Sequence, residues 1–409
     1  MTTNRPVNSK LCPDQGPSAA CVWVGKFAAV ALAMLLMATA VVYAKPSGPA
    51  TVSQVRSSAP LGIPYLTHRA YHSKIEIVRK LGDFQGYSSY DVKYDSDGLS
   101  LRAVMNVPAA PAPKRGYPVL IMMHGNFQEN WGRLSFYHSE QQDSDEYRNK
   151  DFYAQVITRY AKEGFVVFFP DYRGYGQSET HGQHAGNWQL DRNGNPAVNK
   201  HGQTVARSLD DEGLRANGWL YTSYYTIDVL NLLAAIRSDA AIGPARLDRA
   251  SVFMWGHSLG GDVAARAFTC AKGVMAASLW SPATTSLWDQ AHHYHHDSIY
   301  ANGTSLEDLF VELKTYNRVH HTALRARDMA PSNFIEQVRG PVLLQVSEND
   351  DGVRSAWAIE YAYELQEYGV RAALLTYPGT DHSFKGEVLE KAIQADLAFF
   401  RAQVRDWKP

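Results

Sequence analysis

Residues 251–271 read SVFMWGHSLGGDVAARAFTCA, and this stretch decides the fold. Its apolar start, Ser251–Trp255, predicts a strand that is buried on both faces. The next five residues, 256–260, fit the pattern Gly-x-Ser-x-Gly, and a helical pattern follows from Gly261 to Ala271. A serine on a tight turn between a strand and a helix has an exposed hydroxyl beside the backbone N–H groups that begin the helix.

The glycines on either side of the serine have a steric reason. At a turn this tight the backbone passes close to other chain segments, and side chains at Gly256 and Gly260 would clash with them. Ser258 is therefore the predicted nucleophile. The backbone N–H of Leu259, at the start of the helix, is placed to bind the negative oxygen that develops when a carbonyl is attacked.

Two loops late in the chain supply the groups that a serine nucleophile requires. A serine hydroxyl needs a base within hydrogen-bond reach, and that base needs an acid to orient it. The loop after the predicted strand Val342–Val346 contains Asp350 and Asp351, and the loop after Ala372–Tyr377 contains His382. Acid and then base is the order in which this serine motif is completed along a chain. We predict Asp350 as the orienting acid, with Asp351 as the alternative, and His382 as the general base.

The rest of the chain alternates short apolar runs with helical patterns, after a leading antiparallel pair, Tyr87–Tyr94 and Leu99–Val107. The runs that predict strands are Val119–Met123, Phe165–Phe169, Ser251–Trp255, Val274–Trp280, Val342–Val346 and Ala372–Tyr377. The patterns that predict helices are Phe152–Lys162, Trp219–Arg237, Gly261–Ala271, Ala356–Tyr368 and Glu387–Arg401. This alternation predicts an α/β fold with a mostly parallel central sheet and helices on both faces.

Four motifs together resemble the α/β-hydrolase superfamily, and within it the catalytic domains of the prolyl oligopeptidase (S9-type) family and related bacterial esterases. The motifs are the strand end Ile121–Asn126, the glycine-rich stretch Pro170–Ser178, the serine turn, and the paired loops with Asp350-Asp351-Gly352-Val353 and with His382. The resemblance covers the chain from Tyr87 to the C-terminus. It implies an α/β-hydrolase fold and a serine hydrolase that cleaves an ester or an amide or peptide bond.

The resemblance also implies roles for individual residues. The loop that starts at Asp350 is similar to the family's Asp-x-x-Val loop, whose first Asp is catalytic, and this favours Asp350 as the acid. The turn after His124 implies a second oxyanion donor, the backbone N–H of Asn126 or, as the alternative, of Phe127. The stretch Asp171–Ser178 is expected to brace the strand ends. Prolyl oligopeptidases often have a tyrosine side chain near this turn, and here the position is His124.

The N-terminal part of the chain predicts export. An uninterrupted apolar run, Phe27–Ala44, follows basic residues, so residues 1–44 are expected to be a cleaved signal peptide or an uncleaved membrane anchor. In both cases the catalytic part is exported, as a periplasmic or secreted protein, and meets a membrane only through this segment. Residues 45–86 are expected to be a linker and lead-in. Residues 87–409 are expected to be the catalytic domain, with a lid insertion at 281–337.

The net charge and the remaining motifs bear on which partners, metals and cofactors the protein is expected to bind. The net charge of −1 gives no general attraction to nucleic acid. His292 and His296 have the spacing of zinc ligands on a helix, but no acidic or cysteine motif completes a site, so neither a metal nor a cofactor is expected. The span between Lys45 and the first predicted strand is too short for a propeller that screens peptides. The predicted substrate is therefore a small ester or a short peptide. The alternative is a non-catalytic binding protein on the same fold.

Overall fold

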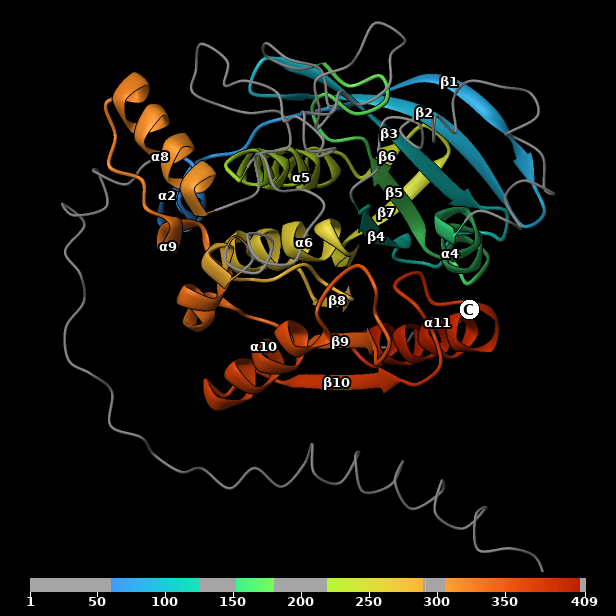
Figure 1. Ribbon diagram of the computed structural model, residues 1–409. Helices are drawn as coiled ribbons and strands as arrows, with labels where there is room; N and C mark the ends of the chain where they lie inside the picture. The colour runs from blue at the N-terminus through green and yellow to red at the C-terminus, as the bar shows by residue number, and fades with distance from the viewer. Residues whose placement is uncertain (1–59, 126–151, 180–218, 290, 292–305, 405–409) are drawn as a thin grey trace, which may run out of the picture. The chain divides into compact units, whose positions relative to one another are not determined.

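The structure is a computed structural model, and it describes residues 60–125, 152–179, 219–289, 291 and 306–404 (Figure 1). Predictions for several parts of the chain lie outside these ranges and stay predictions. These parts are residues 1–44, the oxyanion candidates Asn126 and Phe127, and His292 and His296. In the described part of the chain, no helix has both the length and the apolar character that crossing a bilayer requires.

One mixed sheet of ten strands organises the described residues, in the order β1-β2-β3-β5-β4-β7-β8-β9-β10, with β6 paired to β7. The strands are β1 (Ile75–Phe84), β2 (Tyr87–Ser96), β3 (Leu99–Pro108), β4 (Tyr117–Met123), β5 (Val166–Pro170), β6 (Ala241–Ile242), β7 (Ala245–His257), β8 (Ala276–Trp280), β9 (Val342–Ser347) and β10 (Ala372–Tyr377). Along this order the pairs from β1 to β5 are antiparallel, and the pairs from β5 to β10 are parallel. The predicted α/β fold with a mostly parallel sheet is confirmed.

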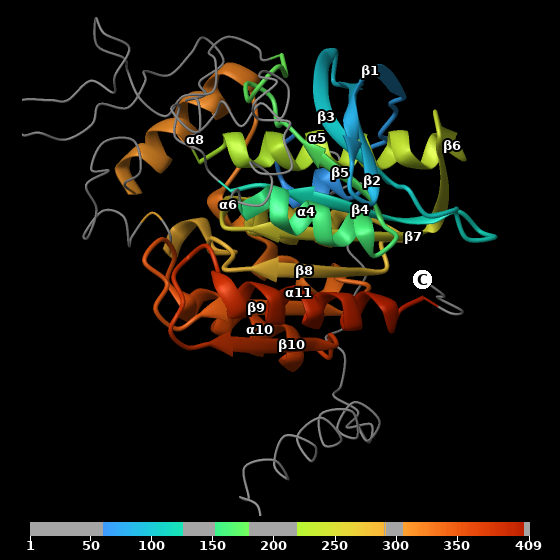
Figure 2. The same cartoon turned by 90° about the vertical axis from the view of Figure 1, so that its right-hand side faces the viewer.

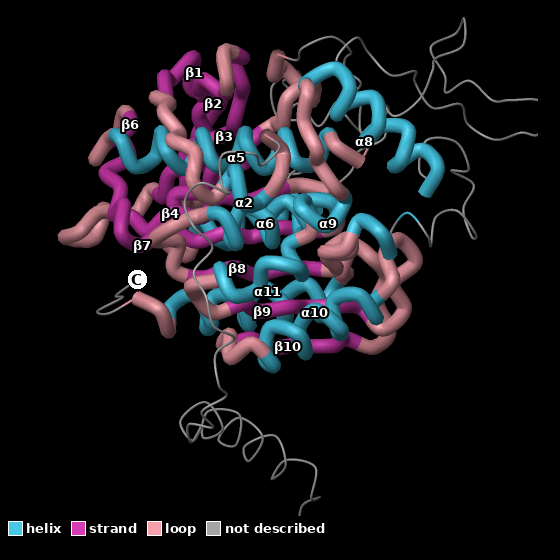
Figure 3. Tube along the Cα trace, turned by 90° about the vertical axis from the view of Figure 1, so that its left-hand side faces the viewer, coloured by secondary structure: helices cyan, strands magenta, loops and turns pink. Residues whose placement is uncertain are grey.

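Helices cover both faces of the sheet (Figures 2 and 3). One face carries α4 (Phe152–Lys162) and α11 (Gly386–Arg401), and the other carries α5 (Tyr221–Ser238), α6 (Leu259–Cys270) and α10 (Ser355–Glu367). The other helical elements among the described residues are α2 (Ile63–Leu66), α8 (Leu306–His320), α9 (Ala326–Met329) and the 3₁₀ helix η2 (Pro331–Gln337). Helices on both faces leave the loops at the carboxyl edge of the parallel strands as the place for a site.

The alternation of side chains along the strands divides the core between the two faces. In β5, Val166 and Phe168 pack on the side of α5 and α6, whereas Val167 and Phe169 pack on the side of α4 and α11. Successive strand residues point to opposite faces, so a strand covered on both sides is apolar throughout. Every residue of β5 is buried, and this explains the continuous apolar run by which the sequence predicts it.

The sheet begins earlier in the chain than the sequence predicts. β1 pairs with β2, from Ile75 opposite Tyr94 to Phe84 opposite Tyr87, so the lead-in expected within residues 45–86 contributes an edge strand to the sheet. β1 is the edge strand, and most of its side chains are exposed or half-buried. An edge strand with this exposure has no regular alternation of apolar and polar residues, so the sequence carries no period-2 signal for it.

The described parts of the predicted lid insertion, residues 281–337, differ in how they pack against the rest of the domain. Its last element, η2, packs against α6 and α10, and Ile335 is fully buried. This part therefore belongs to the body of the domain. α8 buries Leu309 and Leu313 on one side. A lid role stays a prediction for the part of the insertion before α9.

Candidate active site

Ser258 lies between the end of β7 and the start of α6, on the turn that the motif predicts. Its backbone has φ 59° and ψ −125°, and a conformation that non-glycine residues rarely adopt costs about 1–3 kcal/mol. The flanking glycines make the turn possible. A Cβ on Gly256 would overlap the carbonyl oxygen of Gly260, and a Cβ on Gly260 would overlap that of Met123. The surrounding backbone therefore holds the serine in a strained conformation.

Backbone hydrogen bonds tie this turn to β8 and the segment that follows β8. The Ser258 N–H donates to the Trp280 carbonyl at 3.0 Å, and the Ser258 carbonyl accepts the N–H groups of Gly261 and Ala283, both at 2.9 Å. Leu259 is the first residue of α6. The helix itself therefore offers no acceptor for the Leu259 N–H, as the predicted oxyanion role requires.

Asp350 and His382 come together in the loops after β9 and β10. His382 Nδ1 lies 2.9 Å from Asp350 Oδ1 and 3.0 Å from Oδ2. Asp350 Oδ1 also accepts the N–H groups of Gly352 and Val353, at 2.9 and 2.7 Å. Burial alone would raise the pKa of Asp350, but the hydrogen bond and charge of His382, with the Val353 N–H, hold its pKa below the ordinary value. The side chain of Asp350 is 1% exposed and that of His382 is 20% exposed. A buried carboxylate thus orients a ring that reaches solvent.

Asp351, the alternative acid, takes a different position. Its Oδ1 accepts the backbone N–H of His382 at 3.3 Å. Among the described residues, the hydrogen bonds of the His382 imidazole to a carboxylate go to Asp350 alone. The geometry therefore favours Asp350 over Asp351 as the orienting acid.

Phe384 anchors the loop that carries His382. Phe384 is fully buried and has a positive φ of 47°. Its ring centroid lies 5.0 Å from that of Trp280 and 5.8 Å from that of Tyr377. The hydroxyl of Ser347, at the end of β9, donates to the carbonyl of Thr380 in the same loop. The acid loop and the base loop are thus fixed to each other as well as to the core.

The structure brings Ser258 and His382 to the same edge of the sheet. Within the described residues, the hydrogen bonds of the His382 side chain do not reach the Ser258 hydroxyl. The ring of His257, the neighbour of Ser258, lies 4.6 Å from the ring of His382. Catalytic hydrogen bonds are often long or poorly aligned without substrate and tighten in the complex. The structure thus pairs Asp350 with His382, while a hydrogen bond between Ser258 and His382 stays a prediction.

Two further side chains, for which the sequence predicts no role, lie beside Ser258 and His382. The hydroxyl of Tyr153, in α4, lies 2.8 Å from His257 Nδ1 and accepts the N–H of Gly125 at 2.7 Å. His257 Nε2 lies 2.8 Å from the carbonyl oxygen of His382. His257 is the variable position of the serine motif, and Tyr153 lies in an ordinary helical pattern. Neither residue carries a signal by which the sequence alone could select it.

The turn after β4 lies against the nucleophile. A Cβ on Gly125 would lie 2.9 Å from Tyr153 Oη and 3.0 Å from Ser258 Cβ. Burial lowers the pKa of His124 to about 4, against the opposing effect of the Gly125 carbonyl, and the His124 ring lies 4.3 Å from that of Tyr172. A neutral, buried ring packs here as an aromatic support for the turn. Asn126 itself lies outside the described residues, so its role as an oxyanion donor stays a prediction.

The stretch Asp171–Ser178 makes structural contacts on both sides. Arg173 pairs with Asp228 of α5 at 2.5 Å, and both side chains are buried. The Ser178 hydroxyl accepts the N–H of Arg102 in β3 at 2.9 Å and donates to the Asp171 carbonyl at 2.8 Å. These bonds hold the stretch between β3 and α5, in agreement with the bracing role that the sequence predicts.

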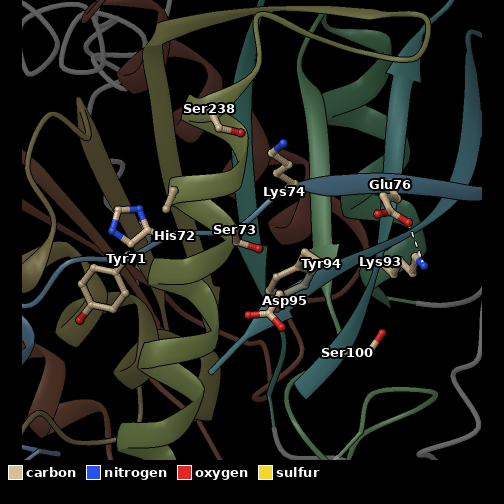
Figure 4. Close-up of a pocket in the computed structure, with 11 residues that line it drawn as sticks. Tyr71, His72, Ser73, Lys74, Glu76, Lys93, Tyr94, Asp95, Ser100 and Ser238 are labelled. Carbon is tan, nitrogen blue, oxygen red and sulfur yellow. Dashed lines mark ion pairs between the residues drawn. The ribbon is translucent and has the colours of Figure 1, made fainter. Parts of the chain in front are cut away.

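A groove of about 610 Å³ lies between the segment before β1, β2 and α5 (Figure 4). Charged side chains such as Lys74 and Asp95 line it, and Lys93 pairs with Glu76 at 2.8 Å. None of its lining residues belongs to the predicted triad. Among the described residues, no group of three or more His, Cys, Asp or Glu side chains is placed to hold a metal ion.

The sequence from residue 222 to residue 406 matches the prolyl oligopeptidase family, Peptidase_S9. This region is a prolyl oligopeptidase family domain. The S9 domain contains Ser258, Asp350 and His382. This matched region is a serine hydrolase domain, of either a peptidase or an esterase, as its resemblance to the family implies.

Several solved structures share the fold of this chain. Acetyl xylan esterase 1 from Thermoanaerobacterium sp. JW/SL YS485 matches with a TM-score of 0.54 and 17% identity, over 85% of this chain and 98% of its own. The acetyl xylan esterase from Paenibacillus sp. R4 matches with a TM-score of 0.51 and 15% identity, over 87% of this chain and 100% of its own. A puromycin-hydrolyzing peptidase of Mycobacterium tuberculosis matches with a TM-score of 0.52 and 19% identity, over 78% of this chain.

The three solved structures differ in the share of their own length that this chain covers. The chain covers 40% of the mycobacterial peptidase, so it spans less than half of that protein. At these identities the likeness establishes the fold alone. No curated protein matches the sequence significantly.

Proposed function

We propose that this protein is an esterase that hydrolyses small esters through an acyl-enzyme formed on Ser258. The observation that carries the proposal is the pairing of His382 Nδ1 with the buried Asp350 carboxylate, 2.9 Å apart, beside the turn that presents Ser258. A carboxylate in this position keeps the proton on Nδ1, so that Nε2 is the nitrogen that can accept another. This is the arrangement that a general base for a serine requires.

In the proposed mechanism, His382 Nε2 takes the hydroxyl proton of Ser258 as its oxygen attacks the ester carbonyl. The N–H of Leu259, with that of Asn126 as the predicted second donor, hydrogen-bonds to the negative oxygen of the tetrahedral intermediate. The protonated His382, stabilised by Asp350, then gives the proton to the departing alcohol. Water attacks the acyl-enzyme with His382 again as base, and this step releases the acid and restores Ser258.

Fold neighbours that are named as esterases support small esters as substrates. Two acetyl xylan esterases share the fold, with TM-scores of 0.54 and 0.51. Their names suggest an acetyl ester as the kind of bond that this site would cleave. We infer that an acyl group of acetyl size is the first to test.

A short-peptide serine peptidase is the second candidate function. The match of residues 222–406 to the prolyl oligopeptidase family favours it. The same three residues serve both reactions, because His382 protonates a departing amine as it does a departing alcohol. The two functions differ in the groups that hold the substrate on either side of the scissile bond.

A substrate panel separates these functions. Purified protein is assayed on p-nitrophenyl acetate, butyrate and octanoate, and on p-nitroanilides of alanine and of alanyl-proline, with the Ser258→Ala variant as the control. The proposal predicts the highest kcat/KM on acetate or butyrate, and loss of that activity in Ser258→Ala. Turnover of anilides without turnover of esters would establish the peptidase instead. Equal activity of the variant and the wild-type protein would overturn both.

A further inference from the structure

A series of three hydrogen bonds, each with a defined donor and acceptor, links the turn after β4 to the neighbour of Ser258 and to the backbone of His382. It begins with the N–H of Gly125, which can only donate, and the hydroxyl oxygen of Tyr153 accepts it at 2.7 Å. It ends at the carbonyl oxygen of His382, which can only accept, 2.8 Å from His257 Nε2. Nε2 of His257 must therefore carry a hydrogen.

The protonation state of His257 determines the direction of the hydrogen bond between Tyr153 and His257. His257 is 4% exposed, and burial lowers its pKa to about 3, with the nearby His382 acting in the same direction. The ring is therefore neutral at working pH, with its one hydrogen on Nε2 and a lone pair on Nδ1. The Tyr153 hydroxyl, 2.8 Å from Nδ1, must donate to it. The direction of every bond is thus set: Gly125 to Tyr153, Tyr153 to His257, and His257 to His382.

These three hydrogen bonds join three segments whose relative positions matter for catalysis. Gly125 belongs to the turn of the predicted oxyanion donor, His257 precedes Ser258, and His382 is the predicted base. The bonded residues are 28, 104 and 125 positions apart in the chain, so no local structure holds them together. Tyr153 and His257 are both buried, so water does not compete for the bonds.

We propose that Tyr153 and His257 are positioning residues for the hydrolytic reaction: they hold the oxyanion turn and the backbone of His382 in register with Ser258. The proposal rests on the proposed function in so far as Ser258 and His382 react. A second consequence follows from the neutral ring. His382 becomes positively charged in each cycle, and an uncharged His257 ring 4.6 Å away does not repel that charge.

Tyr153→Phe tests the first link, because it removes one oxygen and leaves the ring in place. We expect kcat to fall by about 10- to 100-fold, with KM changed by no more than about threefold, because a slight misplacement of reacting groups costs rate rather than binding. The matched control is Tyr160→Phe in the same helix. Tyr160 is also buried, and its hydroxyl donates to Asp396 of α11 and not to a triad residue or to His257. It should lower the melting temperature and leave kcat within about twofold.

Two substitutions at His257 test the second link and do not depend on the Tyr153 variant folding. The amide of His257→Gln can donate to the His382 carbonyl and accept from Tyr153, whereas His257→Leu can do neither. We expect Gln to keep at least about five times the kcat of Leu. The double variant Tyr153→Phe, His257→Leu should lose little more than His257→Leu alone, because both changes break the same series of hydrogen bonds.

The rate of reaction with a fluorophosphonate gives a readout that is independent of the substrate. This probe reacts with any activated serine. If the wild-type protein labels at Ser258 but cleaves only anilides, the esterase proposal fails and the positioning proposal is still tested by the labelling rates. Equal labelling rates of Tyr153→Phe and Tyr160→Phe, or of His257→Gln and His257→Leu, would overturn the positioning role. Wild-type protein that does not label at all would overturn it as well, since no reacting serine would be there to position.

Discussion

Gly352 lies directly against the ring of His382: a Cβ at this position would be 2.8 Å from His382 Cγ and 2.9 Å from Cδ2. The N–H of Gly352 also donates to Asp350 Oδ1 at 2.9 Å. The loop of Asp350 therefore acts on His382 in two ways. Its carboxylate binds Nδ1, and its backbone limits where the ring can lie.

Gly352→Ala is expected to lower kcat/KM by about 10- to 100-fold, because the added methyl group displaces the His382 ring from Asp350 and Ser258. Steady-state kinetics with the best substrate of the panel measures this effect. Gly98→Ala is the control, since Gly98 has φ +85° and no atoms within 4 Å of its added Cβ. It should lower the melting temperature through backbone strain and leave kcat/KM nearly unchanged. The same kcat/KM in Gly352→Ala as in the wild-type protein would show that the ring is not confined here.

Asp350→Asn and Asp351→Asn should differ greatly in activity. Asp350→Asn removes the charge that stabilises protonated His382 and disturbs its tautomer, so we expect kcat to fall by about three to four orders of magnitude. Asp351→Asn changes only a 3.3 Å bond to the backbone N–H of His382, and a loss of less than about tenfold is expected. Comparing kcat of the two variants decides between the adjacent carboxylates. A larger loss in Asp351→Asn would transfer the role of orienting acid to Asp351.

Acid should destabilise the fold through its buried histidines. Burial lowers the pKa of His257 to about 3 and that of His124 to about 4, from an ordinary value of 6.5. Below pH 6.5 the unfolded state binds protons that the folded state does not. The stability from the neutral rings is therefore full above pH 6.5 and is lost progressively as the pH falls from 6.5 through about 4 for His124 and about 3 for His257.

His257→Gln removes one of these titrating groups. Its melting temperature should therefore decline less steeply than that of the wild-type protein between pH 6.5 and pH 4. Calorimetric scans of both proteins across this range make the comparison. Parallel curves would mean that His257 is not held neutral in the folded state.

The Arg173–Asp228 pair should matter more for folding than for chemistry. The two side chains are 3% and 0% exposed, so removing one partner leaves a buried charge without compensation. Asp228→Ala should lower the free energy of unfolding by about 3–5 kcal/mol. Urea titration measures this loss, and Glu76→Ala, which removes a partner from the exposed pair with Lys93, is the control that should change little. Equal midpoints in the two variants would contradict a bracing role for Arg173.

The sequence predicts those parts of the site that local chemistry determines. Gly256 and Gly260 are required by the turn itself, so the position of Ser258 is visible in five consecutive letters. Asp350 and His382 are predicted because each follows a continuous apolar strand in the expected order. The strands β4 and β5 are predicted for the same reason, since both faces of each are buried.

Features that depend on distant contacts could not be predicted in this way. β1 is an exposed edge strand, and its pairing with β2 does not depend on an apolar pattern. Tyr153 has a role only because α4 lies beside the end of β7, and a tyrosine in an amphipathic helix gives no sign of this. His257 likewise gains its partners from the fold and not from its place in the motif.

Covalent labelling of Ser258 tests the central claim most directly. Full-length protein is treated with a fluorophosphonate, and the labelled peptide is identified by mass spectrometry in the wild-type, Ser258→Ala and His382→Ala proteins. The account predicts one labelled residue, Ser258, in the wild-type protein, no label in Ser258→Ala, and labelling slowed by at least about 100-fold in His382→Ala. Labelling of another serine, or an unchanged rate in His382→Ala, would contradict the claim that His382 activates Ser258.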